Sequence, residues 1–575
     1  MTNQIIREAA TPTPLAGQEE SALFIPALGE PVLRVNNIQG NILGGFHKDY
    51  QTLIFLEIEN PSAFKQWLKT QIKFIATASE VIAFNRIFKS ARERRGREGT
   101  VKATWVNIAF SFEGLKKLTA SADNFTDEAF KAGLAARAAE LNDPVDSQGK
   151  PIGWVVGGPD NGKTDVVFIV ASDDRTDLLA EVARILESIV LFQDENGNLI
   201  NSGAKITFLE EGANLPQPLS GHEHFGNLDG ISQPGIRGRV SDNSKDLLTP
   251  RQDPKNPNQG KPGQDVLWPG EFVFGYPGQN PDAKKLEDSK GAIASAGPKW
   301  ADDGSYLVFR RLRQDVFKFH KFLKDTASEL NTIPTKVSAK LIGRWPSGAP
   351  TVRTPEADAP SLGNDDNANN DFEFNGDDEP ENGFFKNDVV PPSQDATGLR
   401  CPFIAHTRKT YPRDDKTPGG GGPGPEEIDR SEVTTQTHRL LRRGIPYGPV
   451  SASTPDQPLQ DSTFVDRGLH FLAYQTSIVD QFEFVTKFWS NNPNFSEEAA
   501  KGHEFEGKPT LGHDPIIGQS NGENGDRTRK FFVHLEDKNS QPVTKELTAP
   551  EDWVIPTGGG YFFAPSISAL KNVLT

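Results

Sequence analysis

Short strand patterns, each followed at once by one helical pattern, recur in both halves of the chain and constrain its fold more than any other feature. Residues 52–59 alternate, and each strand segment runs directly into a helical segment. The strand and helix pairs are 52–59 with 61–69, 105–110 with 112–120, 165–171 with 174–188, 305–309 with 315–323, and 469–474 with 478–489. Further strands are expected at 205–210 and 561–564. This order predicts two α+β domains of one type, in which helices flank the sheets.

Composition divides the chain into three parts. Residues 1–32 are rich in proline, alanine, threonine and glutamate and lack periodicity, so we expect a mobile N-terminal arm. The strand and helix pairs then define an N-terminal domain at 33–220 and a C-terminal domain at 221–575. The second domain carries long insertions, of which the first is a stretch rich in proline, glycine and asparagine at about 235–280.

An acidic segment at 356–388 holds eleven acidic residues and one lysine, Lys386. Within it, the run that starts at Asp371 imitates the start of an EF-hand calcium loop. Asn382 stands at the twelfth position, however, where such a loop requires a bidentate glutamate. We therefore expect a solvated acidic loop, with a weak divalent-cation site as the alternative.

The charge balance excludes two classes of partner. In the 575 residues, 62 lysines and arginines face 78 aspartates and glutamates, which gives a net charge of −16 at pH 7. A surface of that sign repels phosphate backbones and anionic lipid headgroups, so we expect no nucleic acid and no membrane as partners. The chain also lacks a basic and apolar leader and a long apolar run, which predicts a cytoplasmic protein. The oligomeric state is not predicted by these features.

Sulfur chemistry is restricted by a single cysteine, Cys401. One thiol cannot form an internal disulfide, a cysteine-rich zinc site or an iron–sulfur cluster. It also excludes the paired cysteines that link haem covalently to a chain.

Two histidines, His222 and His224, would point the same way if their segment were extended. Together with Glu223 or Asp229 they could form a site of two histidines and one carboxylate, which is typical of non-haem iron enzymes. One histidine pair without a third ligand in place is weak support for a metal site, so this hypothesis is kept only as an alternative.

Three further segments concentrate residues that can do chemistry. Segment 226–235 places Asp229 between two glycines, which permit unusual backbone angles and the close approach of a flat ligand. In segment 401–413, His406 is followed by three cations, an arrangement that suits an iron-binding imidazole with cations for haem propionates. Segment 439–448 embeds arginines among apolar residues, where they usually need an anionic partner.

Taken together, these segments resemble those of the dye-decolourising peroxidases, a haem peroxidase family. The motifs that carry the resemblance are GNLDG, CPFIAHTRKTYPR, RLLRRGIPYG, RGLHFLAYQ and TGGGYFFAPS, and the likeness runs from about residue 35 to the C-terminus. The resemblance implies two ferredoxin-like domains with antiparallel sheets, and a haem held by the C-terminal domain. The length and the long insertions are most similar to the larger fungal and cyanobacterial members.

The resemblance also implies roles for single residues. The distal aspartate of the family matches Asp229, its distal arginine matches Arg442, and its proximal iron ligand matches His406. Asp229 would move a proton between the two oxygens of peroxide, and Arg442 would stabilise the charge on the leaving oxygen. Leu469 and Phe471 are similar to the apolar distal wall.

The remaining haem contacts are assigned less directly. We expect Gly230 to let the haem approach the backbone and Arg408 to pair with a propionate. The family also implies a carboxylate behind the proximal histidine, and Asp514 and Asp552 are both candidates. Either one would accept a hydrogen bond from the imidazole and increase its donation to iron.

The implied activity is reduction of hydrogen peroxide coupled to oxidation of anthraquinone-type dyes and of phenolic or other aromatic reductants. The implied cofactor is one noncovalent b-type haem per chain. A large dye would not enter a pocket sized for peroxide, and Tyr447 is then either an oxidisable residue on an electron route or part of the core. Two other functions stay open: a haem-binding or haem-trafficking protein without turnover, and a non-haem metal oxidase that uses His222 and His224.

Overall fold

The computed structural model describes residues 30–95, 101–194, 196–238, 240–241, 249–250, 256, 258–374, 395–417, 431–503, 510–522, 525–536 and 542–575. Most of the arm expected at 1–32 and the last part of the acidic segment, 375–388, lie outside the described residues.

The first half of the chain forms an antiparallel sheet with helices in its connections. Its strands are β1 (Tyr50–Ile58), β2 (Thr104–Phe110), β3 (Val166–Ser172) and β6 (Ala204–Ala213). They lie in the order β2-β3-β1-β6, and every neighbouring pair is antiparallel. Helices α3 (Pro61–Gln71) and α4 (Ala78–Arg95) follow β1, and α8 (Arg175–Val190) follows β3. This order and these two crossovers make the ferredoxin-like arrangement.

The second half repeats this arrangement. Its strands are β13 (Ser305–Gln314), β14 (Leu441–Arg442), β15 (Ile445–Tyr447), β16 (Gly468–Gln475) and β19 (Val554–Ala564). The order is β19-β13-β16, and the two short strands β14 and β15 pair with the other edge of β16. Helices α9 (Val316–Leu330) and α10 (Pro334–Ile342) follow β13. The π-helical turns η8 (Ile478–Glu483) and η9 (Val485–Ser490) follow β16. The α+β class with ferredoxin-like antiparallel units is therefore confirmed.

The two sheets join at both edges and close into one ring of strands. Phe563 on β19 pairs with Phe110 on β2, and Tyr447 on β15 pairs with Gly212 on β6. The pairing of β13 with β16 completes the ring. The patterns in the sequence did not predict this closure, because each joint depends on a pairing between residues that are far apart in the chain.

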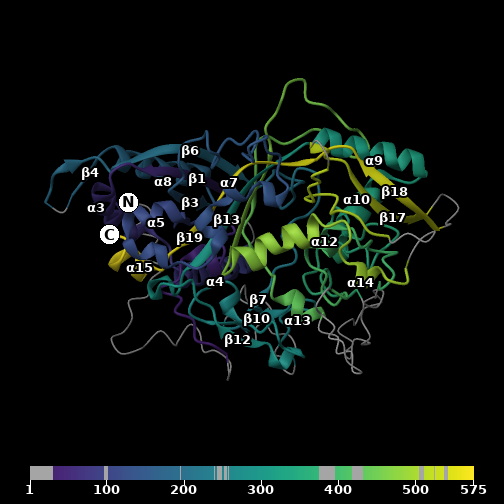
Figure 1. The fold of residues 1–575 in the computed structure, drawn as a ribbon, viewed down its shortest axis with the longest axis horizontal. Helices are drawn as coiled ribbons and strands as arrows, with labels where there is room; N and C mark the ends of the chain where they lie inside the picture. The colour runs from purple at the N-terminus through teal and green to yellow at the C-terminus, as the bar shows by residue number, and fades with distance from the viewer. Residues whose placement is uncertain are drawn as a thin grey trace.

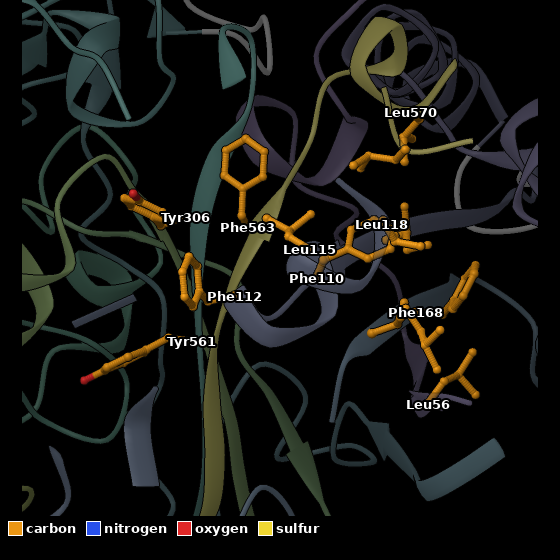
Figure 2. Close-up of a cluster of buried hydrophobic side chains, with 14 of the residues drawn as sticks. Leu56, Phe110, Phe112, Leu115, Leu118, Phe168, Tyr306, Tyr561, Phe563 and Leu570 are labelled. Carbon is orange, nitrogen blue, oxygen red and sulfur yellow. The ribbon is translucent and has the colours of Figure 1, made fainter. Parts of the chain in front are cut away.

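Separate hydrophobic cores fill the inside and cover the outside of this ring. Inside, the ring of Phe55 on β1 lies 5.2 Å from that of Phe309 on β13, which shows that opposite walls are in contact. Outside, α3, α8 and α5 (Phe112–Leu118) pack on the strands, and Figure 2 shows Phe110, Leu115, Phe168 and Phe563 within this outer cluster. Local caps define the helix starts; the Asp174 carboxylate, for example, accepts hydrogen bonds from Thr176 and Asp177 N–H at the start of α8.

A third core lies away from the first-half helices. Helices α9 and α10 and the hairpin of β17 (Arg529–Glu536) with β18 (Pro542–Ala549) lie together at one end of the molecule (Figure 1). Phe319, Leu341 and Phe531 are buried within this core. Each strand and helix predicted from the sequence is observed, whereas α4, α10, β14, β15 and this hairpin were missed.

The remaining elements are short. They are α2 (Gly40–Leu43), η2 (Ile72–Phe74), η3 (Ala120–Asn124), α6 (Glu128–Ala132), α7 (Leu134–Arg137), η4 (Ala139–Leu141), β4 (Phe192–Gln193), β5 (Leu199–Ile200), β7 (Gly235–Ile236), β8 (Val240–Ser241), β9 (Thr249–Pro250), β10 (Val266–Leu267), η5 (Pro269–Glu271), β11 (Pro277–Gln279), η6 (Leu286–Asp288), β12 (Lys290–Ile293), η7 (Lys299–Ala301), α11 (Pro360–Gly363), α12 (His406–Thr410), α13 (Ser431–Gln436), α14 (Glu497–Ala500) and α15 (Ile567–Asn572).

Candidate active site

A cavity of about 610 Å³ lies where the loop 221–233 meets strands β13 and β16 and helix α12. This volume is typical of sites for small molecules and cofactors, which enclose about 300 to 1,000 Å³. The segment 438–446 and the turns η8 and η9 complete its wall. Asp229, His406 and Arg442, which the sequence analysis placed in separate motifs, all line this one cavity.

Asp229 lies on a loop whose backbone depends on two glycines. Gly226 and Gly230 adopt φ angles of +92° and +75°, which residues with a side chain rarely adopt. The Asp229 N–H donates to Gly221 O at 3.0 Å, and the Gly230 N–H donates to the Asp229 carboxylate at 2.6 Å. These bonds hold the carboxylate while leaving the side chain 39% exposed at the cavity.

Arg442 approaches the same carboxylate from strand β14. Its Nη1 lies 3.6 Å from Asp229 Oδ1. Its Nη2 donates to Ser232 O at 2.8 Å, and its backbone N–H donates to Gln233 Oε1 at 3.2 Å. The loop that carries Asp229 therefore holds the guanidinium, and Nη1 lies on the side of the Asp229 carboxylate.

The neighbouring Arg443 has a different, structural task. It donates to Asn41 O at 3.0 Å and to Ile42 O at 3.0 Å, so it satisfies carbonyl groups of α2. Burial lowers the pKa of Arg443 to about 10. Of the two adjacent arginines, the one predicted from the sequence, Arg442, is the one paired with Asp229.

His406 begins α12 and pairs with a buried carboxylate. Its Nδ1–H donates to Asp514 Oδ2 at 2.8 Å. Burial lowers the pKa of His406, but the Asp514 charge outweighs burial and leaves that pKa above its usual value. The other ring nitrogen, Nε2, has no hydrogen-bond partner among the described residues, and His406 lines the cavity. One ring nitrogen is thus fixed while the other is available to a ligand.

Asp514 is itself held rigidly. Its other oxygen accepts hydrogen bonds from Ile516 N–H at 2.7 Å and Ile517 N–H at 3.0 Å. Burial raises the pKa of Asp514, but His406 and these two N–H groups together hold it below the usual range. The second candidate, Asp552, instead pairs with Arg527 at 2.6 Å. The geometry therefore separates two aspartates that the sequence could not separate.

Strand β16 supplies one apolar wall. Leu469 and Phe471 line the cavity, whereas His470 between them pairs with Glu210 at 2.7 Å on the other face of the strand. This alternation is the ordinary two-residue period of a strand. Gly230 also lines the cavity, and a Cβ built on it would meet nothing within 4 Å, so the space beside it is open.

Arg408 does not line the cavity, which argues against its predicted contact with a haem propionate. Its guanidinium is 1% exposed, donates twice to Asp415 at 2.6 Å and also donates to Cys401 O at 2.8 Å. Residues two apart on a helix point in different directions, so Arg408 faces the protein interior when His406 faces the cavity. The spacing of residues in the motif could not predict that the Arg408 and His406 side chains point in different directions.

Replacement of Arg408 by methionine should therefore reduce stability without changing how haem is ligated. Asp415 would lose its partner inside the protein, a change that typically costs about 3 to 5 kcal/mol. Urea unfolding would measure the loss, and the absorption spectrum of the folded haem-loaded variant should match the wild type. A changed axial-ligand spectrum at unchanged stability would contradict this assignment.

The two-histidine metal site does not assemble. His224 Nε2 bonds to Tyr447 O at 2.9 Å, and Glu223 accepts hydrogen bonds from Phe225 and Asn227 N–H. His222 Nδ1 lies 3.1 Å from Ser220 O. Over the described part of the chain, no group of three or more histidine, cysteine or acidic side chains is arranged to hold a metal ion.

His224 should instead make stability sensitive to acid. Burial lowers its pKa to about 4, so it stays neutral in the folded protein while the unfolded chain binds a proton below about pH 6.5. Its contribution is present above pH 6.5 and is lost as the pH falls toward 4, by an amount on the order of 3 kcal/mol. We expect His224→Gln to show a smaller drop in urea midpoint between pH 7 and 5 than the wild type. Equal drops would contradict this account.

Tyr447 is packed in the core. It is 2% exposed, and its ring stacks on His470 with centroids 4.8 Å apart. The Arg311 guanidinium covers the ring at 4.1 Å. Of the two roles considered from the sequence, the packing role matches this environment.

Residues that the sequence analysis did not single out also line the cavity. Tyr411 lies just past α12, and its hydroxyl donates to Asp265. Arg439 pairs with the same carboxylate at 2.6 Å and stacks on the Tyr411 ring at 3.5 Å. In the sequence, Tyr411 and Arg439 stand out only because they lie in the two cation-rich segments. That position alone does not predict that they line the cavity.

Comparison with known proteins places the chain in a family. The profile described as "DyP dimeric alpha+beta barrel domain" matches residues 37–202. A dye-decolorizing peroxidase of Mycena epipterygia is 33% identical over 95% of this chain and 88% of its own length. The chain belongs to the dye-decolourising peroxidase family.

Solved structures of the family agree with this assignment. A variant of the Pleurotus ostreatus dye-decolorizing peroxidase matches with a TM-score of 0.70 and 32% identity, and the match covers 95% of this chain and all of the other. Two more dye-decolorizing peroxidases, one in complex with 2,6-dimethoxyphenol and one with an engineered heme pocket, match with TM-scores of 0.65 and 30% identity. Each of these matches covers 94% of this chain and all of the other.

The protein is therefore a dye-decolourising haem peroxidase, and this function is confirmed over the trafficking and non-haem alternatives. No helix within the described ranges is long and apolar enough to cross a membrane.

Proposed function

We propose that this peroxidase reduces hydrogen peroxide at one noncovalent b-type haem per chain and oxidises phenols and anthraquinone-type dyes. The observation that carries the proposal is that His406, which pairs with the buried Asp514, lines the same cavity as the Asp229–Arg442 pair. The complex of a relative with 2,6-dimethoxyphenol supports the choice of phenolic reductants.

The donor set in the cavity fits a haem. His406 presents Nε2, a nitrogen of the kind that binds haem iron, and Cys401 is buried and cannot form a covalent link of the paired-cysteine type. Gly230 leaves open space beside the loop, and Leu469 and Phe471 offer apolar contact. When bound, haem would supply the redox chemistry that accepts electrons from the reductant and passes them to peroxide.

His406 would hold the iron, and Asp514 would fix the direction of the imidazole. Because the Asp514 carboxylate accepts from Nδ1–H, the ring keeps the tautomer that presents Nε2. This arrangement would place His406, and with it the cofactor, in the C-terminal domain at 221–575.

Asp229 would act as the base that takes a proton from one peroxide oxygen and returns it to the other. Arg442, at 3.6 Å, would donate toward the oxygen that gains negative charge as the bond between the oxygens breaks. The bonds from Arg442 to Ser232 and Gln233 keep the guanidinium in place, so little reorganisation is needed.

A cytoplasmic location stays a prediction.

The test is an absorption spectrum of the purified protein followed by turnover. We expect a Soret band, extraction of the haem by acidified butanone, and peroxide-dependent oxidation of both 2,6-dimethoxyphenol and an anthraquinone dye. A Soret band without peroxide-dependent turnover, or absence of the band, would contradict the proposal.

A further inference from the structure

Part of the cavity lining comes from one end of the closed sheet. It includes Phe46, His47, Lys48, Gln51, Ala171 and Asn214, and we call this part the Gln51 arm. Gln51 is the second residue of β1, Ala171 is the last but one of β3 and Asn214 follows β6, so the arm lies where three neighbouring strands meet the cavity. None of the steps assigned to the peroxide reaction uses these residues.

Gln51 carries a hydrogen-bond donor that has no partner. It lies two residues before Leu53 and therefore on the inner face of the sheet, where Leu53 and Phe55 are buried. In the sheet register it stands opposite Ala171 on one side and Gly212 on the other. Gln51 is 6% exposed, and its Nε2 has no hydrogen-bond partner in the part of the chain that the structure describes.

An unpartnered buried donor is costly, because the amide gives up water and gains nothing in return. Such a group in a cavity wall is satisfied when a ligand brings an acceptor oxygen. The Nε2 group can only donate, so the ligand atom that satisfies it is an acceptor.

The lysine of the arm already has a carboxylate partner, which favours a neutral acceptor over an anion. Lys48 is 3% exposed and pairs with Asp173 at 2.5 Å, and its ammonium lies 4.2 Å from the Phe84 ring centre. Asp49 accepts a hydrogen bond from the Asn214 amide at 3.0 Å. The wall thus combines one open donor with the apolar surface of Phe46, which suits an aromatic molecule that has one polar end.

We propose that the Gln51 arm binds the carbonyl or ether oxygen of an aromatic reductant, with Gln51 Nε2–H as donor. This inference rests on the proposed function, because it names the polar end of the reductant that the peroxidase oxidises. Gln51 would then select among aromatic reductants by the position of an acceptor oxygen, without taking part in the reaction with peroxide.

The test measures binding in the absence of peroxide, using para-hydroxyacetophenone and its carbonyl-free analogue para-isopropylphenol. Calorimetry gives the Kd of each for haem-loaded wild type and for Gln51→Leu. We expect the variant to bind para-hydroxyacetophenone about threefold to tenfold more weakly, the loss of one neutral hydrogen bond, and to bind para-isopropylphenol about as well as wild type. An equal loss for both ligands, or no loss for either, would overturn the proposal.

Two further variants separate the subsite from general damage. Gln475→Leu is the matched control, since Gln475 is also a buried strand glutamine with an unpartnered amide but does not line the cavity. It should leave both Kd values unchanged, and a shift like that of Gln51→Leu would overturn the proposal. Ala171→Leu should fill the arm and weaken both ligands. Because binding is read without peroxide, failure of the peroxidase activity would count against the proposed function and leave this test intact.

Discussion

Replacement of Asp229 by asparagine should slow the reaction with peroxide by at least about 100-fold, because loss of a positioned proton acceptor typically costs a factor of about 10² to 10⁴. Arg442→Leu should slow the same reaction by about 10² to 10³, the usual cost of one lost donor to developing charge. Stopped-flow absorption of the haem band after mixing with peroxide measures both rates. Asp229 and Arg442 lie 3.6 Å apart, so their effects on the rate should not be independent. The double variant should be slowed by less than the product of the two single-variant factors.

The controls for this pair are chosen by position. Asp366→Asn makes the same chemical change at a carboxylate that is 75% exposed and outside the cavity, and it should react at the wild-type rate. Arg442→Lys keeps the charge but cannot copy the geometry of the guanidinium, so we expect partial recovery only. Unchanged rates in Asp229→Asn or in Arg442→Leu, with haem fully bound, would rule out the corresponding role.

His406→Ala should remove the axial imidazole. The variant should then either lose most of its haem or hold haem with an absorption spectrum that differs from the native one. The cavity left by the ring should accept free imidazole, which we expect to restore the native absorption bands. Asp514→Asn should keep haem bound but weaken donation from His406, because the neutral amide accepts less strongly from Nδ1–H than a carboxylate does. The measurable sign is a rise in the reduction potential of the iron.

Asp552→Asn is the matched control for Asp514→Asn. Asp552 pairs with Arg527 and lies near Arg529, so its replacement should affect stability and leave the reduction potential unchanged. If the two aspartate variants shift the potential equally, or if His406→Ala retains the wild-type spectrum without added imidazole, the ligand assignment is wrong.

Local patterns in the sequence predicted the elements of the fold but not how the two halves join. The continuous apolar run of β3 and the Asp174 cap of α8 give signals within a few residues. The joints at Phe110–Phe563 and Gly212–Tyr447 depend on pairings between residues more than 200 positions apart, for which one sequence holds no local signal. The β17–β18 hairpin was missed because no strand-and-helix pair marks it.

The candidate site divides in a similar way. Asp229, His406 and Arg442 lay in dense motifs, and the structure brings all three to one cavity. Asp514 could not be chosen over Asp552, because the choice depends on which loop folds behind α12. Arg408 was assigned from its closeness to His406 in sequence, although a step of two residues turns a helical side chain away from the cavity.

The closed ring of strands also has a consequence for how the protein is made. On the ribosome, β2 can pair with β3 long before β19 has been synthesised, so the β2 edge that later receives Phe563 stays open meanwhile. Open strand edges and exposed inner faces such as that around Phe55 are the surfaces on which nascent chains aggregate. Long-range pairings of this kind also form slowly. Production of the enzyme should therefore depend on chaperones that shield the first half until the second arrives, and slower expression at low temperature should raise the yield of folded protein.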